Sequence, residues 1–225
     1  MSELGTRSLV QQQKPRRQHW RRAAAGLAVA FVLAAAPPPV LAMPSTGGDV
    51  VQSLYTTLLD MMKQGRTLGE SGRFAQLSPV IRRIFDLPLM TRLSVGPVWA
   101  TLGDAQRGQL IDSFGRYISA IYAERFDSYH GQKLEVTGQD SAPSGIIVRS
   151  RIVKADGDPV KVDYLMHQSG ASWLISDIYL DGTISELATR RSEFAAIIRA
   201  QGIEGLIGAL NRKADLLTRT TARAE

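Results

Sequence analysis

The chain contains no cysteine among its 225 residues. It therefore cannot form a disulfide, use a thiol nucleophile or bind a metal through thiolates. An oxidising compartment permits disulfides without requiring them, so this absence does not contradict export from the cytoplasm.

Groups typical of catalysis are also scarce. Beyond residue 42 only two histidines remain, His130 and His167. A helical His-x-x-x-His pair, a Gly-x-Ser-x-Gly elbow, a P-loop and a Gly-x-Gly-x-x-Gly turn are all missing from the sequence. His130 precedes Gly131, where a cation suits the end of a helix, and His167 lies near a predicted hairpin turn. We therefore predict no catalytic residue, no metal site and no cofactor.

Two acidic patterns have structural explanations. Asp177 and Asp181 share one strand parity and could pair as acid and base, but Asp181-Gly182 is also an ordinary turn dipeptide. Asp156-x-Asp158 lacks the later Gly and Glu of a calcium loop and is followed by Pro159, so it is predicted to be a hairpin turn.

The positive charge of the chain is concentrated at its N-terminus. Residues 1–42 hold 6 of the 27 Lys and Arg residues and 1 of the 21 acidic ones, which leaves 21 basic against 20 acidic residues. Nucleic-acid binding is therefore not predicted. The pairs Arg149/Arg151 and Arg190/Arg191 are expected on solvated faces, with a phosphate or partner contact as the alternative.

Residues 1–42 have the pattern of a secretory signal peptide. Basic residues precede an apolar run of 14 residues, Ala23 to Ala36, and small residues at Val40-Leu41-Ala42 suit cleavage. The run is shorter than the roughly 20 residues needed to span a bilayer. The alternative is an uncleaved membrane anchor. Residues 43–48 are predicted to form a flexible leader.

The next part of the chain has helical periodicity. A first amphipathic helix is predicted over about 49–64, and a second pattern follows Gly72 with Ser78-Pro79 as its capping pair. Pro88 and Gly96-Pro97 divide the following stretch into short helical pieces. The longest helix is predicted from Asp104, as its N-cap, to about Asp127.

After Gly131 the apolar period changes from 3.6 to 2. Four strands are predicted around Leu134–Val136, Val148–Ile152, Val160–Met166 and Trp173–Leu180, and short turns make them antiparallel neighbours. Helical periodicity returns from Ser185, stops near Gly202 and continues in a last helix to Leu217. The expected fold class is α+β, a single domain over 49–217 in which N-terminal helices, a four-stranded meander and C-terminal helices enclose an apolar pocket, with a polar tail at 218–225.

The order of several motifs resembles the MlaC family of phospholipid-binding proteins of the Mla pathway. The resemblance covers about residues 49–215 and rests on Gly96-x-x-Trp99, Gln106-Arg107, Leu110, Phe114, Tyr122, Phe126, "YHGQ" at 129–132, "GDPVKVDYLM" at 157–166, Trp173, Asp177, Asp181-Gly182, Phe194, Ile198, Gly202, Leu206 and Leu210.

One departure favours a particular branch of that family. "DGTISELATRRSEF" has one residue more between Gly182 and Phe194 than the expected Gly-Val-Ser corner gives. With "FDLP" at 85–88 and "MTRLSVGPVW" at 90–99, the chain looks most like the hopanoid biosynthesis-associated branch, HpnM.

The resemblance implies a periplasmic carrier whose sheet and helices part to hold lipid chains, with the polar head near the mouth. It implies a hopanoid or phospholipid ligand, an inner-membrane lipid transporter and an outer-membrane acceptor complex as partners, a monomer and no covalent chemistry. The candidate lining is Ile118, Ile121, Tyr122, Val136, Val148, Val162, Tyr164, Met166 and Ile175. From the residues alone, each of them fits a solid core equally well.

Two other functions stay open at this point. One is a lipid-free periplasmic adaptor that bridges transport components through Arg190 and Arg191. The other is a lipid-modifying enzyme that uses Asp177, Asp181 or His167.

Overall fold

The computed structural model describes residues 46–155 and 157–219. The predicted signal peptide at 1–42, residues 43–45 of the predicted leader, Asp156 and residues 220–225 of the predicted tail lie outside this range. The elements are α1 (Gly47–Lys63), α2 (Gly65–Ile84), α3 (Leu87–Val95), a 3₁₀ helix η1 (Gly96–Thr101), α4 (Asp104–Arg125), β1 (Lys133–Ala142), β2 (Gly145–Val153), β3 (Val160–Ser169), β4 (Ser172–Leu180), β5 (Ile184–Ser185) and α5 (Glu186–Arg219). The predicted α+β class is confirmed.

The first helix begins two residues before its predicted start. Thr46 and Asp49 form a capping box, in which the Thr46 side chain accepts from the Asp49 N–H and the Asp49 carboxylate accepts from the Thr46 N–H. This pair satisfies N–H groups that the first turn would otherwise leave free. Gly47 and Gly48, predicted as leader, are therefore helical.

Two predicted helix starts are wrong. α2 does not begin at Ser78-Pro79 but at Gly65, with a kink at Gly69 (φ 60°), and Pro79 lies inside the helix. Leu77 and Ile81, which flank Pro79, are fully buried, so their packing keeps this stretch helical. Asp104 is the first residue of α4 and not its N-cap, because Gly103 occupies that position.

The last helix has the predicted interruption. α5 consists of two helices joined by a kink at Gly202, whose φ of 70° lies in the left-handed region that favours glycine. The C-terminal part therefore consists of two helical arms. The second arm runs to Arg219, which places the first two residues of the predicted polar tail inside the helix.

The sheet is an antiparallel meander in the order β1-β2-β3-β4-β5. Four of the strands were predicted. The fifth has only two residues, at the corner before α5, and sequence periodicity cannot register so short a strand. β1 and β2 are longer than predicted and end in a tight turn at Pro143-Ser144, where Ala142 pairs with Gly145.

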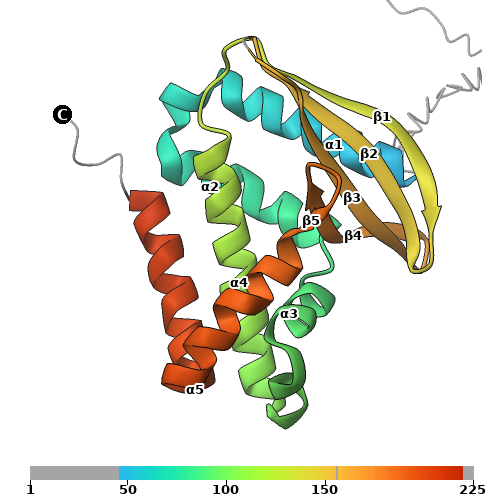
Figure 1. Cartoon of the computed structure of the whole chain (residues 1–225). Coiled ribbons are helices and arrows are strands. Elements are labelled where there is room, and N and C mark those ends of the chain that lie inside the picture. Colours follow the sequence, from blue (N-terminus) through green and yellow to red (C-terminus); the bar gives the residue numbers. More distant parts are fainter. Residues whose placement is uncertain (1–45, 156, 220–225) are drawn as a thin grey trace, which may run out of the picture. The chain divides into compact units, whose positions relative to one another are not determined.

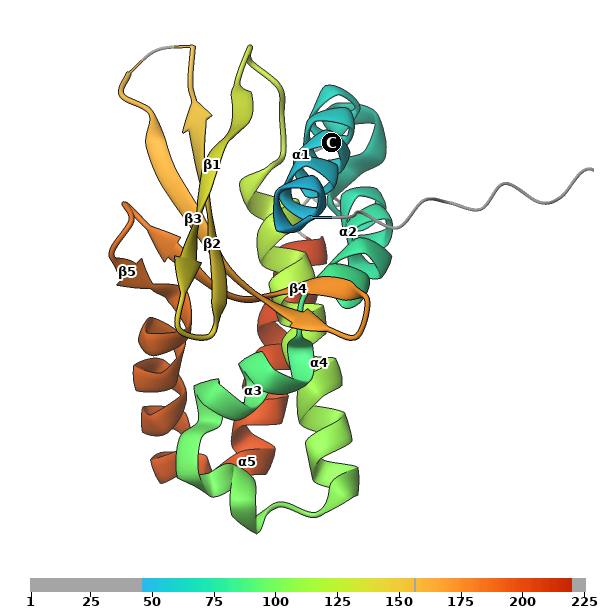
Figure 2. The same ribbon diagram turned by 90° about the vertical axis from the view of Figure 1, so that its right-hand side faces the viewer.

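The curved sheet and the helices form two layers. α1, α2 and α4 lie on one side of the sheet, and α3 and α5 pack beyond its end (Figures 1 and 2). α1 contacts β1, β2 and β4, whereas α4 packs mainly on α2 and α5. α1 therefore covers one part of the inner face of the sheet directly. The remaining part of that face lies opposite α4.

Candidate functional site

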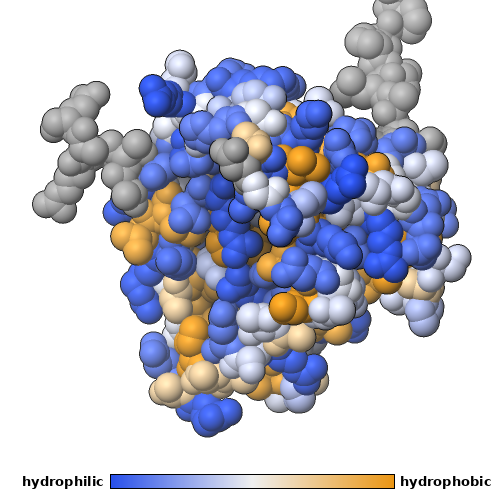
Figure 3. Space-filling view, turned by 45° about the horizontal axis from the view of Figure 1, so that its top comes forward, coloured by the Kyte–Doolittle hydropathy of each residue, from blue (hydrophilic) through white to orange (hydrophobic). Residues whose placement is uncertain are grey.

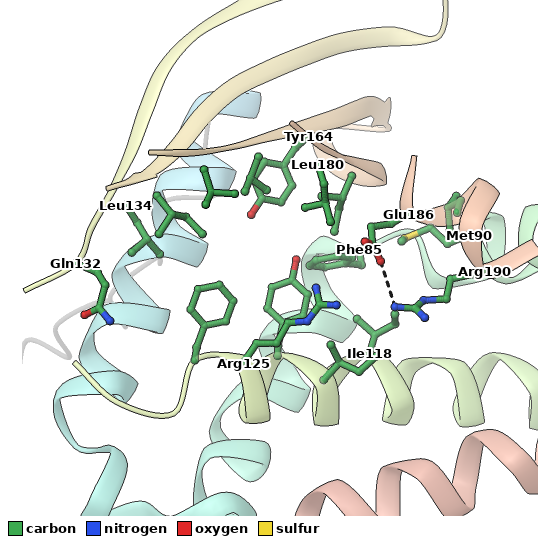
Figure 4. A pocket seen from close by; sticks show the side chains of 18 of the residues that line it. Phe85, Met90, Ile118, Arg125, Gln132, Leu134, Tyr164, Leu180, Glu186 and Arg190 are labelled. Carbon is green, nitrogen blue, oxygen red and sulfur yellow. Dashed lines mark hydrogen bonds and ion pairs between the residues drawn. The ribbon is translucent and has the colours of Figure 1, made fainter. Parts of the chain in front are cut away.

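A cavity of about 430 Å³ lies between α4, the inner face of the sheet and the start of α5. In Figure 4, Tyr164 and Leu180 border it from the sheet, Ile118 and Arg125 from α4, and Phe85 and Met90 from the α2–α3 region. Among the described residues its lining is Met62, Phe85, Met90, Phe114, Ile118, Ile121, Tyr122, Arg125, Phe126, Gln132, Leu134, Ile152, Lys154, Val160, Val162, Tyr164, Ile178, Leu180, Glu186, Leu187 and Arg190.

α4 contributes a single stripe to the cavity. Ile118, Ile121, Tyr122, Arg125 and Phe126 recur at intervals of three and four residues, which places them on one face of a helix. Phe126 stacks on Tyr122 with ring centroids 5.7 Å apart. The helical wall is therefore apolar except for Arg125, which occupies a position of the stripe that periodicity would give to an apolar residue.

The strands contribute side chains of one parity. Val160, Val162 and Tyr164 alternate along β3, and Ile178 and Leu180 alternate along β4. The register pairs Val162 with Leu180 and Tyr164 with Ile178, so these residues form a continuous apolar surface across the two strands.

Five of the nine candidate lining residues border this cavity: Ile118, Ile121, Tyr122, Val162 and Tyr164. The other four lie elsewhere in the interior. Val148, Met166 and Ile175 are fully buried, and Val136 is half-buried against the core. The N-terminus of α1 covers part of this set, because the backbone at Gly47 approaches Met166 and Val148 closely.

Sequence reasoning missed most of the residues at the two ends of the cavity. Met62, Phe85, Met90 and Leu187 come from four separate segments, and their approach is a property of the tertiary structure. Ile178 and Leu180 had a usable signal, because they face Tyr164 and Val162 in the predicted β3–β4 hairpin.

Three buried tyrosines lie at the cavity wall: Tyr122 and Tyr164 border the cavity, and Tyr55 does not. The Tyr55 and Tyr164 rings meet edge to face with centroids 6.0 Å apart, and the Tyr55 hydroxyl is hydrogen-bonded to Ser150. Burial raises the pKa of Tyr55, Tyr122 and Tyr164 above the ordinary value, because a phenolate would lose its hydration there. These hydroxyls are therefore neutral near pH 7.

Charged side chains border the cavity at a few points. Arg190 Nη2 lies 3.2 Å from Glu186, its Nη1 lies 2.8 Å from Glu193, and its guanidinium stacks over the Tyr117 ring at 5.5 Å. Arg125 and Lys154 also border the cavity. Within residues 46–155 and 157–219, neither of these two has a carboxylate within ion-pair distance.

The candidate catalytic residues have structural partners. Asp177 accepts from the N–H of Ile178 and of Leu187 and from the Ser185 hydroxyl, and Asp181 sits in the turn after β4 with φ 51°. His167 Nε2 lies 3.1 Å from the Asp86 carboxylate, which caps α3. None of these three candidate catalytic side chains is among those that border the cavity.

His130, Arg149 and Arg151 also have polar partners within the fold. His130 lies 3.0 Å from the Ser128 hydroxyl in the exposed loop after α4. Arg149 pairs with Asp140 and Asp163, and Arg151 pairs with Glu135, on the outer face of the sheet. In the part of the chain that the structure describes, no cluster of three or more His, Asp or Glu residues could hold a metal ion.

Figure 3 shows a mostly hydrophilic face in which hydrophobic side chains appear in small separate groups. Across the described ranges, no helix is both long enough and apolar enough to cross a bilayer.

A solved structure shares this fold. The phospholipid-binding protein of Ralstonia solanacearum, determined in complex with a phospholipid, matches with a TM-score of 0.66 and 22% sequence identity. The match covers 79% of the present chain and all of the Ralstonia chain.

The family comparison extends over the same elements. The family model described as MlaC protein matches residues 52–212, from α1 to the second arm of α5. Because this is well over half of the sequence and includes every element that borders the cavity, the chain belongs to the MlaC family.

Proposed function

We propose that this protein is a periplasmic carrier that holds a hopanoid or a phospholipid in the cavity and moves it between the inner and outer membranes without covalent chemistry. The observation that carries the proposal is the lining: 16 of the 21 side chains around a space of about 430 Å³ between α4 and the sheet are apolar or aromatic. That volume lies within the roughly 300–1,000 Å³ of typical small-molecule sites.

The physical task of such a carrier is to replace the bilayer. Moving a hydrocarbon chain from a bilayer into water costs about 0.8 kcal/mol of free energy for each CH₂ group that becomes exposed. The apolar surface formed by Val162, Tyr164, Ile178 and Leu180 on the sheet, opposite Ile118 and Ile121 on α4, offers an equivalent environment. Lipid transfer then needs only binding and release.

The nine lining residues named from the sequence remain part of this proposal. Five of them border the cavity directly. Val136, Val148, Met166 and Ile175 would meet a ligand only if α1 or the α2–α3 junction moved away from the sheet. Membership of the MlaC family and the likeness to the Ralstonia phospholipid-binding fold support a lipid ligand. The HpnM resemblance favours a hopanoid within that class.

The rest of the proposal concerns the cellular setting. The N-terminal 42 residues would direct export and be removed, which places the mature monomer in the periplasm. There it would receive its ligand from an inner-membrane lipid transporter and deliver it to an outer-membrane acceptor complex, or the reverse.

The two alternatives have weaker support. An enzyme would need a reactive group at the ligand, yet Asp177 is committed to three hydrogen bonds and Asp181 and His167 do not border the cavity. A lipid-free adaptor docking through Arg190 is disfavoured because that guanidinium is held by Glu186 and Glu193. Arg191 lies at the surface beside Gly96, so a docking role alongside transport stays open for it.

The first experiment is native mass spectrometry of the protein purified from its own periplasm, followed by organic extraction of any bound molecule. We expect one hopanoid or phospholipid per chain. Recovery of a lipid-free protein that also fails to take up lipid from vesicles would overturn the carrier function.

A matched pair of variants tests the cavity itself. Ile118→Trp should narrow the cavity and reduce lipid loading while the protein stays folded. Ile111→Trp, seven residues earlier on α4 and likewise half-buried but away from the cavity, is the control and should load lipid as the wild type does. Equal loading of both variants would count against this cavity as the binding site.

A further inference from the structure

Two cations at the cavity lack an ion-pair partner among the described residues. Arg125 lies in the last turn of α4 and Lys154 directly follows β2, and both border the cavity. Of the four charged residues in the lining, the other two, Glu186 and Arg190, pair with each other. The cavity therefore has two positive charges that no carboxylate of the described residues compensates by an ion pair.

The position of Arg125 follows from the helical stripe. It is seven residues after Ile118 and four after Ile121, so it faces the same side as these apolar residues. In Figure 4 its side chain rises from α4 toward the sheet, between Gln132 and Arg190. A cation in the last turn also interacts favourably with the helix dipole, but that effect does not require it to face the cavity.

The position of Lys154 follows from strand parity. Ser150 and Ile152 point to the inner side of the sheet, and Lys154 is the next residue of that parity. The register pairs Val153 with Lys133, which places Lys154 beside Gln132, just before the start of β1. Two different elements thus each place a cation in line with an apolar stripe.

We propose that Arg125 and Lys154 bind the phosphate group of the ligand at this edge of the cavity, so that a lipid carrying a phosphate is held in preference to a neutral lipid with the same hydrocarbon chains. This inference rests on the proposed carrier function and selects the phospholipid from its two proposed ligands, against the hopanoid that the HpnM resemblance favours. Both side chains are exposed, and a phosphate in contact with them stays partly in water while the chains enter the cavity.

The same two residues predict which way the ligand lies. Glu186 and Glu193 surround Arg190 at the start of α5, so that side of the cavity carries no surplus positive charge. A phosphate is attracted to Arg125 and Lys154, and the chains extend toward Met90 and Leu187. Guanidinium and ammonium groups donate charge-assisted hydrogen bonds to phosphate oxygens, which are stronger than neutral ones.

The test is a competition between two lipids that differ only in the phosphate-containing headgroup. The full mature chain is loaded from mixed micelles with equal amounts of dipalmitoyl phosphatidylglycerol and dipalmitoylglycerol, and the bound ratio is read by native mass spectrometry. We expect the wild type to favour phosphatidylglycerol about tenfold, the effect of one good charge-assisted hydrogen bond. The preference should fall between about 50 and 500 mM NaCl, because salt screens exposed charges.

Variants then separate the two cations from general charge effects. Arg125→Gln/Lys154→Gln should reduce the preference to near parity without reducing the uptake of dipalmitoylglycerol. The control, Lys161→Gln/Lys213→Gln, removes the same charge at exposed positions. Lys161 lies between Val160 and Val162 but on the opposite face of β3, and neither control residue borders the cavity. This control variant should keep the wild-type ratio of the two lipids. Unchanged thermal unfolding of both double variants would confirm that they fold.

Each outcome has a defined meaning. Equal uptake of the two lipids by the wild type, or an unchanged preference in the Arg125/Lys154 variant, would overturn the headgroup inference and leave the carrier function standing. Failure to take up either lipid would also overturn the headgroup inference and would leave the hopanoid as the remaining ligand of the proposed carrier. Titration with inorganic phosphate tests the other source of this chemistry: stoichiometric binding of phosphate alone, lost in the Arg125/Lys154 variant, would show that the site serves a free anion instead of a lipid.

Discussion

The carboxylate of Asp177 accepts a hydrogen bond from the backbone N–H of Leu187 at 3.2 Å, which ties β4 to the first turn of α5. The same carboxylate accepts from the Ser185 hydroxyl at 2.6 Å, and Ser185 in turn accepts from the Ala188 N–H. Leu187 borders the cavity. Asp177, which the sequence offered as a candidate acid or base, therefore holds the turn between β4 and α5 in place next to the cavity.

Asp177→Asn should lower the free energy of unfolding by about 1–2 kcal/mol, because one of the two accepting oxygens becomes an NH₂ donor and the charge is lost. Urea denaturation measures this change. The control is Asp181→Asn, an exposed turn position with φ 51° that Asn tolerates, which should stay within about 0.5 kcal/mol of the wild type. Loss of a catalytic turnover in the Asp177→Asn variant with unchanged stability would instead favour the enzyme alternative.

Arg73 is a second buried polar anchor. Its Nε donates to the Ala123 carbonyl at 2.8 Å and its Nη1 to the Gly65 carbonyl at 2.9 Å, joining α2 to the last turns of α4. Arg73→Met should cost about 2–3 kcal/mol in chemical denaturation, because two carbonyls lose their partner. Arg83→Met on the exposed face of the same helix is the control. Similar losses in both would show that the Arg73 contacts contribute little.

The hairpin between β1 and β2 depends on a glycine. Gly145 has φ 145°, and a Cβ there would lie 2.0 Å from the carbonyl oxygen of Met166. Gly145→Ala should therefore destabilise the protein by about 1–3 kcal/mol, the range of local backbone strain. Gly138→Ala in β1, where a Cβ meets no atom within 4 Å, should have little effect. Thermal unfolding of the two variants makes the comparison.

The buried tyrosines predict an alkaline limit to stability. Burial raises the pKa of Tyr55, Tyr122 and Tyr164 in the folded protein, so in the unfolded chain they lose their protons at lower pH. The folded state then binds more protons, and its stability is fully present below about pH 10 and falls as the pH rises above that value. Each such group can contribute up to about 1.4 kcal/mol per pH unit.

Phenolate absorbance measured alongside circular dichroism checks this limit. The phenolate signal of these three residues should appear together with unfolding and not before it. Tyr122→Phe should make the loss of stability at alkaline pH less steep. Full ionisation of all six tyrosines in a protein that retains its native dichroism would contradict the prediction.

Sequence periodicity predicted the faces of the elements better than their positions. Tyr164 and Met166 share one parity of β3, so both were assigned to the inner face, and both are buried there. Only Tyr164 borders the cavity, because α1 covers the part of the sheet around Met166. Parity defines the face of a strand, but what covers each part of that face depends on where a distant helix docks.

The role of the two cations at the cavity could not be predicted from the sequence, although both residues stand out in it. Arg125 and Lys154 each continue an apolar stripe with a charge, and this break in the pattern is visible in the sequence. The break can be interpreted only once α4 and the end of β2 are known to border the same cavity. That arrangement follows from packing between segments that are well separated in the chain. Pro79 shows a similar limit, since local rules predict a helix start there and core contacts of Leu77 and Ile81 override them.

The docking of α1 against one part of the inner face has a further consequence for the size of any cargo. While α1 remains in place, Val148 and Met166 stay fully buried, so the space cannot lengthen toward the β1–β2 turn. A bulkier molecule must be accommodated at the opposite boundary, where Met90 and Leu187 come from short or newly started helical segments. Differences in capacity between members of the family should therefore map to α3 and the beginning of α5 for as long as α1 stays docked on the sheet.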